Sequence, residues 1–251
     1  MKLTDDIELI DGLPIAYIKS ISSIVLSDLH LGYEGMMARR GVLSPKVNLK
    51  KIKSAVSAAL ERTSAEKVIV TGDIKNDFSD VDVEEFNELH EFIEFVKGKG
   101  ASQLLIKGNH DNFISRYRNA FGVVIKDEYA QVGSYLFFHG DELPKVSKST
   151  RALIMGHEHP AIAVYNEAGR KEKLKCFLYG KYMGLDILIL PAICYFSTGT
   201  EVNIELKDSL LSPVFSKIDL DSMRAIAIGY GSTEDFGKVG DLRALWGRLS
   251  E

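Results

Sequence analysis

Polar side chains of the types that bind metal ions follow five short apolar runs of this 251-residue chain. The five runs, with the clusters that end them, read IVLSDLH, VIVTGD, LLIKGNHD, YLFFHGD and LIMGHEH. Carboxylate oxygens, amide oxygens and imidazole nitrogens are ligands that suit Mn, Fe or Zn ions. Turn chemistry alone would explain one such cluster, but the recurrence indicates a shared metal site. The candidate ligands are Asp28, His30, Asp73, Asn109, His139, His157 and His159.

Two of the clusters contain a pair of candidate ligands that are separated by one residue. Asp28 and His30 form one pair, and His157 and His159 form the other. On an extended segment, residues two apart project to the same side, so each pair is expected to point inward together. The whole set exceeds the needs of one ion, whereas two ions that share a carboxylate would use it. Asp73 is the expected bridge, and ions about 3.5–4 Å apart would hold a phosphoryl group and lower the pKa of a bridging water.

The elements that must position these residues alternate between strand and helix in the first half of the chain. Strand-like runs and runs with helical spacing alternate at 22–27, 45–63, 67–71, 81–100 and 102–107. This order predicts parallel strands joined by right-handed crossovers, whose carboxyl ends converge on one crevice. After residue 120 the pattern predicts a second, antiparallel or mixed sheet and a closing helix over 241–249. We expect an α/β fold that forms a single domain over residues 1–251.

Composition narrows the class of protein. The chain is long enough for a sizeable core, and its net charge of -4 argues against an extended surface for polyanions. The first ten residues, MKLTDDIELI, contain acids where a signal peptide needs an apolar run, and the longest apolar run contains Pro191 and is too short to cross a membrane. Cys176 and Cys194 are the two cysteines and lack zinc-type spacing. We therefore expect a cytoplasmic protein with free thiols and no membrane partner.

The clusters D-x-H, G-D, G-N-H-D, a lone H and G-H-x-H, in this order over residues 28–159, resemble the calcineurin-like metallophosphoesterase superfamily. The resemblance implies a β-sandwich of two mixed sheets flanked by helices, in α-β-β-α layers. It also implies two divalent metal ions, Mn²⁺ first, with Fe, Zn or Ni as alternatives. The ligands implied for one ion are Asp28, His30, Asp73 and His159, and those for the other are Asp73, Asn109, His139 and His157.

The resemblance gives the remaining residues of the GNHD cluster a catalytic role. His110 would lie over the substrate and act as a general acid, while Asp111 would orient and charge its imidazole. Glu158, between two ligands, is expected to point away from the metals, and His90 to lie at the surface. Asn76 could line the site or cap a loop.

Within the superfamily, the stretches DLHLGYEG, RRGVLSP and GDIKNDF are similar to small archaeal-type phosphoesterases related to the SbcD-type DNA-repair nuclease. The chain lacks that nuclease's long capping region, so processing of double-strand breaks is not expected. The leading hypothesis is a phosphodiesterase that cleaves a nucleotide or nucleic acid by attack of a metal-bridging hydroxide. A phosphomonoesterase or nucleotide pyrophosphatase acting on a small metabolite is the alternative. A non-catalytic scaffold is disfavoured because every ligand position is filled; the oligomeric state is not predicted.

Overall fold

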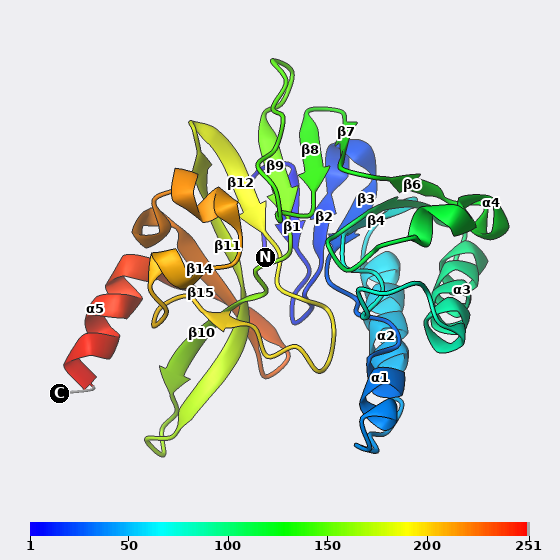
Figure 1. Cartoon of the computed structure of the whole chain (residues 1–251). Coiled ribbons are helices and arrows are strands. Elements are labelled where there is room, and N and C mark those ends of the chain that lie inside the picture. The colour runs from blue at the N-terminus through cyan, green and yellow to red at the C-terminus, as the bar shows by residue number, and fades with distance from the viewer. Residues whose placement is uncertain (250–251) are drawn as a thin grey trace.

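Two mixed β-sheets face each other at the centre of the molecule, and helices cover their outer sides (Figure 1). The computed structural model describes residues 1–249. Helices α1 to α4 lie beside the first sheet, and α5 lies with several short 3₁₀ helices beside the second (Figure 1). The expected two mixed sheets with flanking helices are therefore confirmed.

The first sheet contains the parallel strands that the sequence predicts. Its strands are, in spatial order, β1 (Ile7–Leu9), β2 (Ala16–Ile18), β3 (Ser23–Leu26), β4 (Lys67–Thr71), β5 (Ser102–Ile106) and β6 (Val124–Lys126). Strands β3 to β6 pair in parallel, whereas β1 and β2 extend the edge in antiparallel fashion. The helices of this half are α1 (Tyr33–Arg39), α2 (Asn48–Arg62), α3 (Val83–Gly98) and α4 (Arg118–Phe121). Helix α3 begins with a capping box, in which Asp82 and Glu85 each accept the other's backbone N–H.

The second sheet combines antiparallel hairpins with a parallel centre. Its strands are β7 (Tyr129–Val132), β8 (Tyr135–Phe138), β9 (Ala152–Met155), β10 (Pro160–Tyr165), β11 (Lys171–Tyr182), β12 (Leu185–Ile189), β13 (Thr200–Glu201), β14 (Arg224–Gly229) and β15 (Ser232–Lys238). Strand β9 pairs in parallel with both β8 and β12. The 3₁₀ helices are η1 (Lys19–Ile21), η2 (Ile114–Tyr117), η3 (Lys207–Ser209), η4 (Pro213–Lys217) and η5 (Leu220–Ser222), and the closing helix is α5 (Val239–Leu249).

Both faces of the central strands are buried, which explains their continuous apolar sequences. In β4, Val68 and Val70 pack toward the helices, while Ile69 packs into the layer between the sheets. The second sheet contributes Phe137 and Ile154 to that middle layer. Burying a side chain of this size contributes about 1.5–3 kcal/mol, so the middle layer holds the two sheets firmly against each other.

Several elements were not expected from the sequence, including β1, β2, β14, β15 and α1. The predicted helices over 45–63 and 81–100 are present as α2 and α3, each shorter by a few residues at its ends. Among the described helices, none combines the length and apolar character needed to cross a membrane. That residues 1–251 form a single domain stays a prediction.

Candidate metal centre

Five strands deliver the candidate ligands to one edge of the sandwich. Strands β3, β4 and β5 of the first sheet and β8 and β9 of the second end at this edge, each followed by its polar cluster. The loops are joined by backbone hydrogen bonds: Asp28 N–H donates to the Gly72 carbonyl at 3.1 Å, and His30 N–H donates to the Asp73 carbonyl at 3.0 Å. The site therefore lies where the two sheets meet.

One group of ligand atoms comes from Asp28, His30, Asp73 and His159, whose atoms all lie within 4.8 Å of one another. His159 Nε2 is 3.3 Å from Asp28 Oδ1 and 3.4 Å from His30 Nε2. His30 Nε2 also lies 3.9 Å from Asp73 Oδ2. These four residues are the set expected to hold one ion.

A second group contains Asp73, His139 and His157, again with their ligand atoms within 4.8 Å. His139 Nε2 lies 3.3 Å from Asp73 Oδ1 and 3.0 Å from His157 Nδ1. The Asn109 amide oxygen is 3.1 Å from the same His139 nitrogen. Asp73 thus belongs to both groups, as the predicted bridge should, although the role of these residues as ligands stays a prediction.

The donor set fits a divalent cation in each group. His139 Nδ1–H donates to the Thr71 carbonyl at 3.0 Å, which directs Nε2, the nitrogen that would bind a metal once deprotonated, at the site. Ser197 Oγ lies 2.9 Å from His159 Nδ1 and fixes that ring in a similar way. Pairs of imidazole nitrogens that face each other beside carboxylates repel unless a proton or a cation lies between them. Two oxygen-and-nitrogen cages suit Mn, Fe or Zn.

The backbone is strained at five of the seven candidate ligands. Their φ angles are positive: Asp28 58°, His30 46°, Asp73 46°, His157 70° and His159 51°. Such left-handed conformations cost about 1–3 kcal/mol each for a non-glycine residue and cluster at functional sites. The expectation that each pair lies on an extended segment was therefore wrong. The side chains of these pairs converge because the backbone turns sharply at each of the five residues.

Two glycines in the clusters are required by close packing. A Cβ atom at Gly108 would lie 2.2 Å from Asp73 Oδ1 and 2.5 Å from the Asp73 backbone nitrogen. A Cβ atom at Gly72, whose φ is +98°, would lie 2.2 Å from His139 Nδ1. The glycine before Asn109 and the glycine before Asp73 thus let neighbouring loops approach within contact of the ligands.

Burial and mutual charge perturb the acidity of these groups in the protein without metal. Burial opposes ionisation of Asp73 and Asp28, but neighbouring imidazoles outweigh it and hold the pKa of both carboxyls below its ordinary value. Burial likewise opposes the charged form of His139, yet the Asp73 carboxylate raises the pKa of His139 to about 10. Burial instead dominates at His30 and His157, and lowers the pKa of each to about 4.

His110 lies at the edge of the two groups, with Nε2 3.7 Å from Asp73 Oδ2. Its Nδ1–H donates to the Asn76 carbonyl at 2.5 Å, so Nε2 is directed to the site. Asn76 thus lines the site through its backbone. The remaining exposure of the His110 side chain, 20%, leaves it open to a substrate.

The prediction that Asp111 orients His110 was wrong. The Asp111 carboxylate is fully buried and accepts backbone N–H groups from Ile74, Lys75 and Gly108, at 2.8–3.1 Å. Burial and the nearby Asp73 carboxylate raise the pKa of Asp111 to about 7. Its position ties the loop after β4 to the loop after β5, which is a positioning role.

His90, Glu158 and the two cysteines belong to neither of the two ligand groups. His90 is exposed on α3. Glu158 is buried and accepts the Ser212 N–H at 3.0 Å, away from both ligand groups. Cys176 and Cys194 are buried free thiols.

Sequence reasoning missed the loop after β12, which supplies Ser197. Because β12 runs parallel to β9, its carboxyl end reaches the same edge of the sheet. The stretch STGT that follows it was the available signal. It also missed Lys75 and Phe78, which support and border the site.

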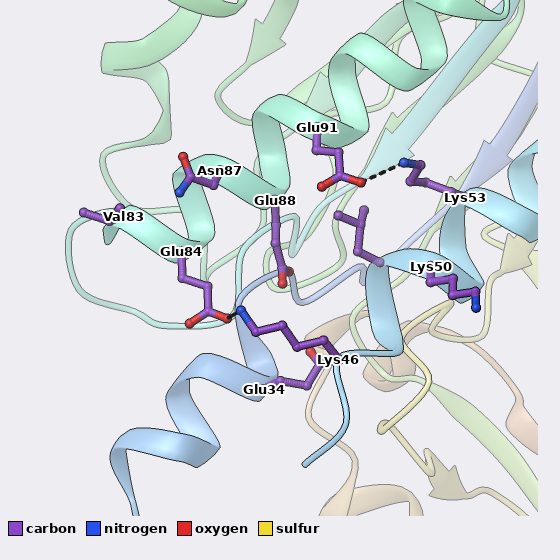
Figure 2. Close-up of a pocket in the computed structure, with 10 residues that line it drawn as sticks. Glu34, Lys46, Lys50, Lys53, Val83, Glu84, Asn87, Glu88 and Glu91 are labelled. Carbon is purple, nitrogen blue, oxygen red and sulfur yellow. Dashed lines mark hydrogen bonds and ion pairs between the residues drawn. The ribbon is translucent and has the colours of Figure 1, made fainter. Parts of the chain in front are cut away.

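A cavity of about 560 Å³ opens beside the candidate centre. Its walls include Asp73, His110, His157, His159, Phe78 and the loop over residues 197–200. A larger cavity of about 670 Å³ lies between α1, α2 and α3 (Figure 2). That cavity contains none of the candidate ligands, and its Lys46 and Lys53 already pair with Glu84 and Glu91 (Figure 2). The chemistry therefore points to the smaller cavity.

Residues 21–174 match the calcineurin-like phosphoesterase family, and the chain belongs to this family. It is a hydrolase that acts on phosphoric ester bonds. The crystal structure of nuclease MPE from Pseudomonas putida shares its fold, with a TM-score of 0.61 and 16% identity over 90% of this chain and 93% of that chain. The E. coli phosphoesterase YfcE matches with a TM-score of 0.41 and 13% identity over 84% of this chain and 95% of that chain. No curated protein matches the sequence.

Proposed function

We propose that the protein is a metal-dependent phosphodiesterase that acts on a nucleotide or nucleic acid. The observation that carries this proposal is the pair of ligand groups that share Asp73, with the His110 imidazole directed to the same place. The fold is shared with a protein described as a nuclease, which agrees with a phosphodiester substrate. The buried free thiols agree with a cytoplasmic location.

The residues that would hold the ions are the two groups described above, with Asn109 in the second. When bound, divalent ions would supply charge stabilisation to the phosphoryl oxygens and a water of lowered pKa; we propose Mn²⁺ first. The strained backbone and the hydrogen bond from His139 to Thr71 hold the ligand atoms in place before any substrate arrives. Such preorganisation lowers the reorganisation needed in the transition state.

His110 would serve as the proton donor to the leaving oxygen. The Asn76 carbonyl accepts the hydrogen on Nδ1 and so holds the ring with Nε2 toward the site. The proton that moves would be the one on Nε2 of the protonated imidazolium, and its loss would leave the neutral ring with Nδ1–H still bound to Asn76. Hydrolysis of an alkyl diester expels an alkoxide, which is a poor leaving group and needs this proton. An activated aryl ester needs it much less, so the two substrate types report on His110 separately.

The metal requirement can be tested with matched aryl esters. We expect EDTA treatment to abolish hydrolysis of an aryl phosphodiester and Mn²⁺ to restore it, with the diester turned over faster than the corresponding monoester. Short single-stranded DNA and a cyclic nucleotide then test natural diesters. Full activity in a verified metal-free sample would refute the mechanism. A clear preference for monoesters, with no diester cleaved, would identify a phosphatase instead.

Replacing the proposed acid tests its role. His110→Ala should lower kcat by about 10²–10⁴-fold on a nucleotide diester, and by much less on an aryl diester. Metal content should stay unchanged, because His110 belongs to neither ligand group. If His110→Ala emptied the site of metal, His110 would be a ligand and the assignment would be wrong.

A further inference from the structure

An exposed aromatic ring borders the cavity directly beside the proposed acid. The centroids of the Phe78 and His110 rings are 3.8 Å apart, with the planes inclined by 32°. Phe78 nevertheless keeps 54% of its surface exposed. It lines the same cavity as Asp73 and His157, so it is open to whatever occupies that space.

The loop that carries Phe78 is held by hydrogen bonds from the side chains of Lys75 and Asn112. Lys75 is 1% exposed, and its ammonium group donates to the carbonyls of Asp77 and Ser79. The Asn112 side chain donates to the Phe78 carbonyl at 3.0 Å. Three consecutive carbonyls are thus bound by two side chains, so the backbone that carries the exposed ring is held in place.

The N–H groups of the same loop are fixed as well. Glu85 at the start of α3 accepts the backbone N–H of Asn76 at 3.2 Å and that of Asp77 at 2.7 Å. Lys75 is buried beside this carboxylate, with its Nζ 4.0 Å from Glu85 Oε2. Burying such a pair costs desolvation free energy, which indicates that the geometry of this loop is needed. The backbone of the loop is therefore ordered before binding, which lowers the entropy lost when a ligand binds and favours affinity.

The order of groups across the site indicates what the ring contacts. The ligand groups, His110 and Phe78 follow one another, with His110 in contact with both neighbours. A leaving oxygen that takes its proton from His110 must lie on the His110 side of the phosphorus. The remainder of the leaving group would then lie against Phe78. Leu211, 70% exposed, adds a second apolar side chain to this cavity.

We propose that Phe78 is a stacking surface for a nucleobase on the leaving side of the substrate, so that the protein is specific for diesters whose leaving group is a nucleoside. This inference rests on the proposed phosphodiesterase function. Stacking of a base on an aromatic side chain contributes about 1–3 kcal/mol and tolerates any base. Phe78 would therefore select nucleotides over other diesters without reading a sequence.

The test compares dinucleotides that differ in one base. One substrate carries both bases, and two others carry an abasic tetrahydrofuran sugar at the 3′ or the 5′ position. Phe78→Ala should lower kcat/KM by about 5- to 150-fold on the substrate with both bases. It should change the value by less than about threefold when the base of the leaving nucleoside is already absent. Phe78→Trp should retain the wild-type preference.

Phe113→Ala is the matched control, because Phe113 is 43% exposed and does not line the cavity. It should behave as wild type on all three substrates. Equal losses for Phe78→Ala on base-bearing and abasic substrates would overturn the proposal and reduce Phe78 to a support for His110. Unfolding temperatures of the variants exclude a general loss of structure.

A binding measurement separates this inference from the proposed function. A dinucleotide with an uncleavable methylphosphonate linkage should bind the Mn²⁺-loaded wild type, and Phe78→Ala should raise its Kd by the factor seen in kcat/KM. If the wild type cleaves no diester but binding of the analogue still depends on Phe78, the proposed function is refuted and the proposed nucleobase site is supported. Binding that is indifferent to Phe78 would overturn the base site alone.

Discussion

The candidate metal centre and the cavity between α1, α2 and α3 both gather ionisable side chains, yet they differ in how those groups are satisfied. In the helix cavity, lysines pair with glutamates at 2.6 and 2.7 Å, and the pairs are partly exposed (Figure 2). Glu34 accepts the N–H groups of Val47 and Asn48 at the start of α2, and Glu88 accepts that of Gly32. These carboxylates hold helices in place.

In the metal centre, the ion pairs that Asp28 and Asp73 make within residues 1–249 are with histidines and not with lysine or arginine. Asp28 and Asp73 are almost wholly buried and sit on strained backbone. They lie beside imidazole nitrogens, and each also accepts one backbone N–H, from His157 and from His110 respectively. Buried charge without a permanent counter-charge is costly, so its retention is a sign of function. The size of a cavity is a poorer guide than the way its charged groups are satisfied.

The largest effect is expected from Asp73→Asn, which removes the charge shared by both ligand groups. Outer-shell substitutions alone lower metal affinity about 10–100-fold, so loss of the bridge should exceed about 100-fold and abolish hydrolysis. Metal analysis after dialysis measures this. A variant that kept both ions would show that Asp73 is not the bridge.

A smaller effect is expected from pH. Ligand imidazoles must be neutral, and nearby carboxylates raise the pKa of His139 to about 10 and also raise that of His159, both against the effect of burial. Apparent Mn²⁺ affinity should therefore rise between pH 6 and 8, by about tenfold per pH unit for each proton released. His30 and His157, with a pKa of about 4, are already neutral there. Metal titration with a pH indicator counts the protons, and an affinity independent of pH would contradict the described acidities.

The raised pKa of His139 should also make the stability of the metal-free protein fall as the pH rises. The raised pKa of His139 stabilises the folded state fully below the unfolded value near 6.5, and this contribution is lost as pH rises through about 10. Thermal unfolding of the metal-free protein between pH 7 and 10 follows this loss.

The smallest effect is expected from Glu91→Gln in the helix cavity. This change also removes one negative charge without changing shape, but Glu91 is 59% exposed beside Lys53. Exposed pairs contribute about 0–1 kcal/mol, so the unfolding free energy should change by less than that, with metal content and kcat unaltered. Denaturant unfolding and metal analysis measure it. A loss of metal here would remove the contrast between the two regions.

Much of the site could be predicted because its ligands follow strands with strong apolar patterns. The order of β3, β4, β5, β8 and β9, and the meeting of their carboxyl ends, depends on local sequence and on general rules of α/β connection. The grouping around Asp73 was expected from the family resemblance, and the structure brings the same residues together.

The remainder depends on contacts between segments that are distant in sequence. Asp111 was predicted to contact its neighbour His110. Its buried carboxylate instead accepts three backbone N–H groups from two loops. The left-handed backbone had a faint signal, since Asp and His adopt it more often than most residues. Nothing in GDIKNDF indicated that Lys75 would be buried under a loop and Phe78 left exposed above it.

The place of the centre at the seam between the sheets has a mechanical consequence. His30 follows a strand of the first sheet and His159 a strand of the second, 129 residues further along the chain. An ion held by both would act as a clamp that closes a very long loop, as a disulfide does, and closing a loop restricts the unfolded chain. Removing the ions would then weaken the attachment of one sheet to the other. Chelation would therefore lower the stability of the folded protein as well as its activity.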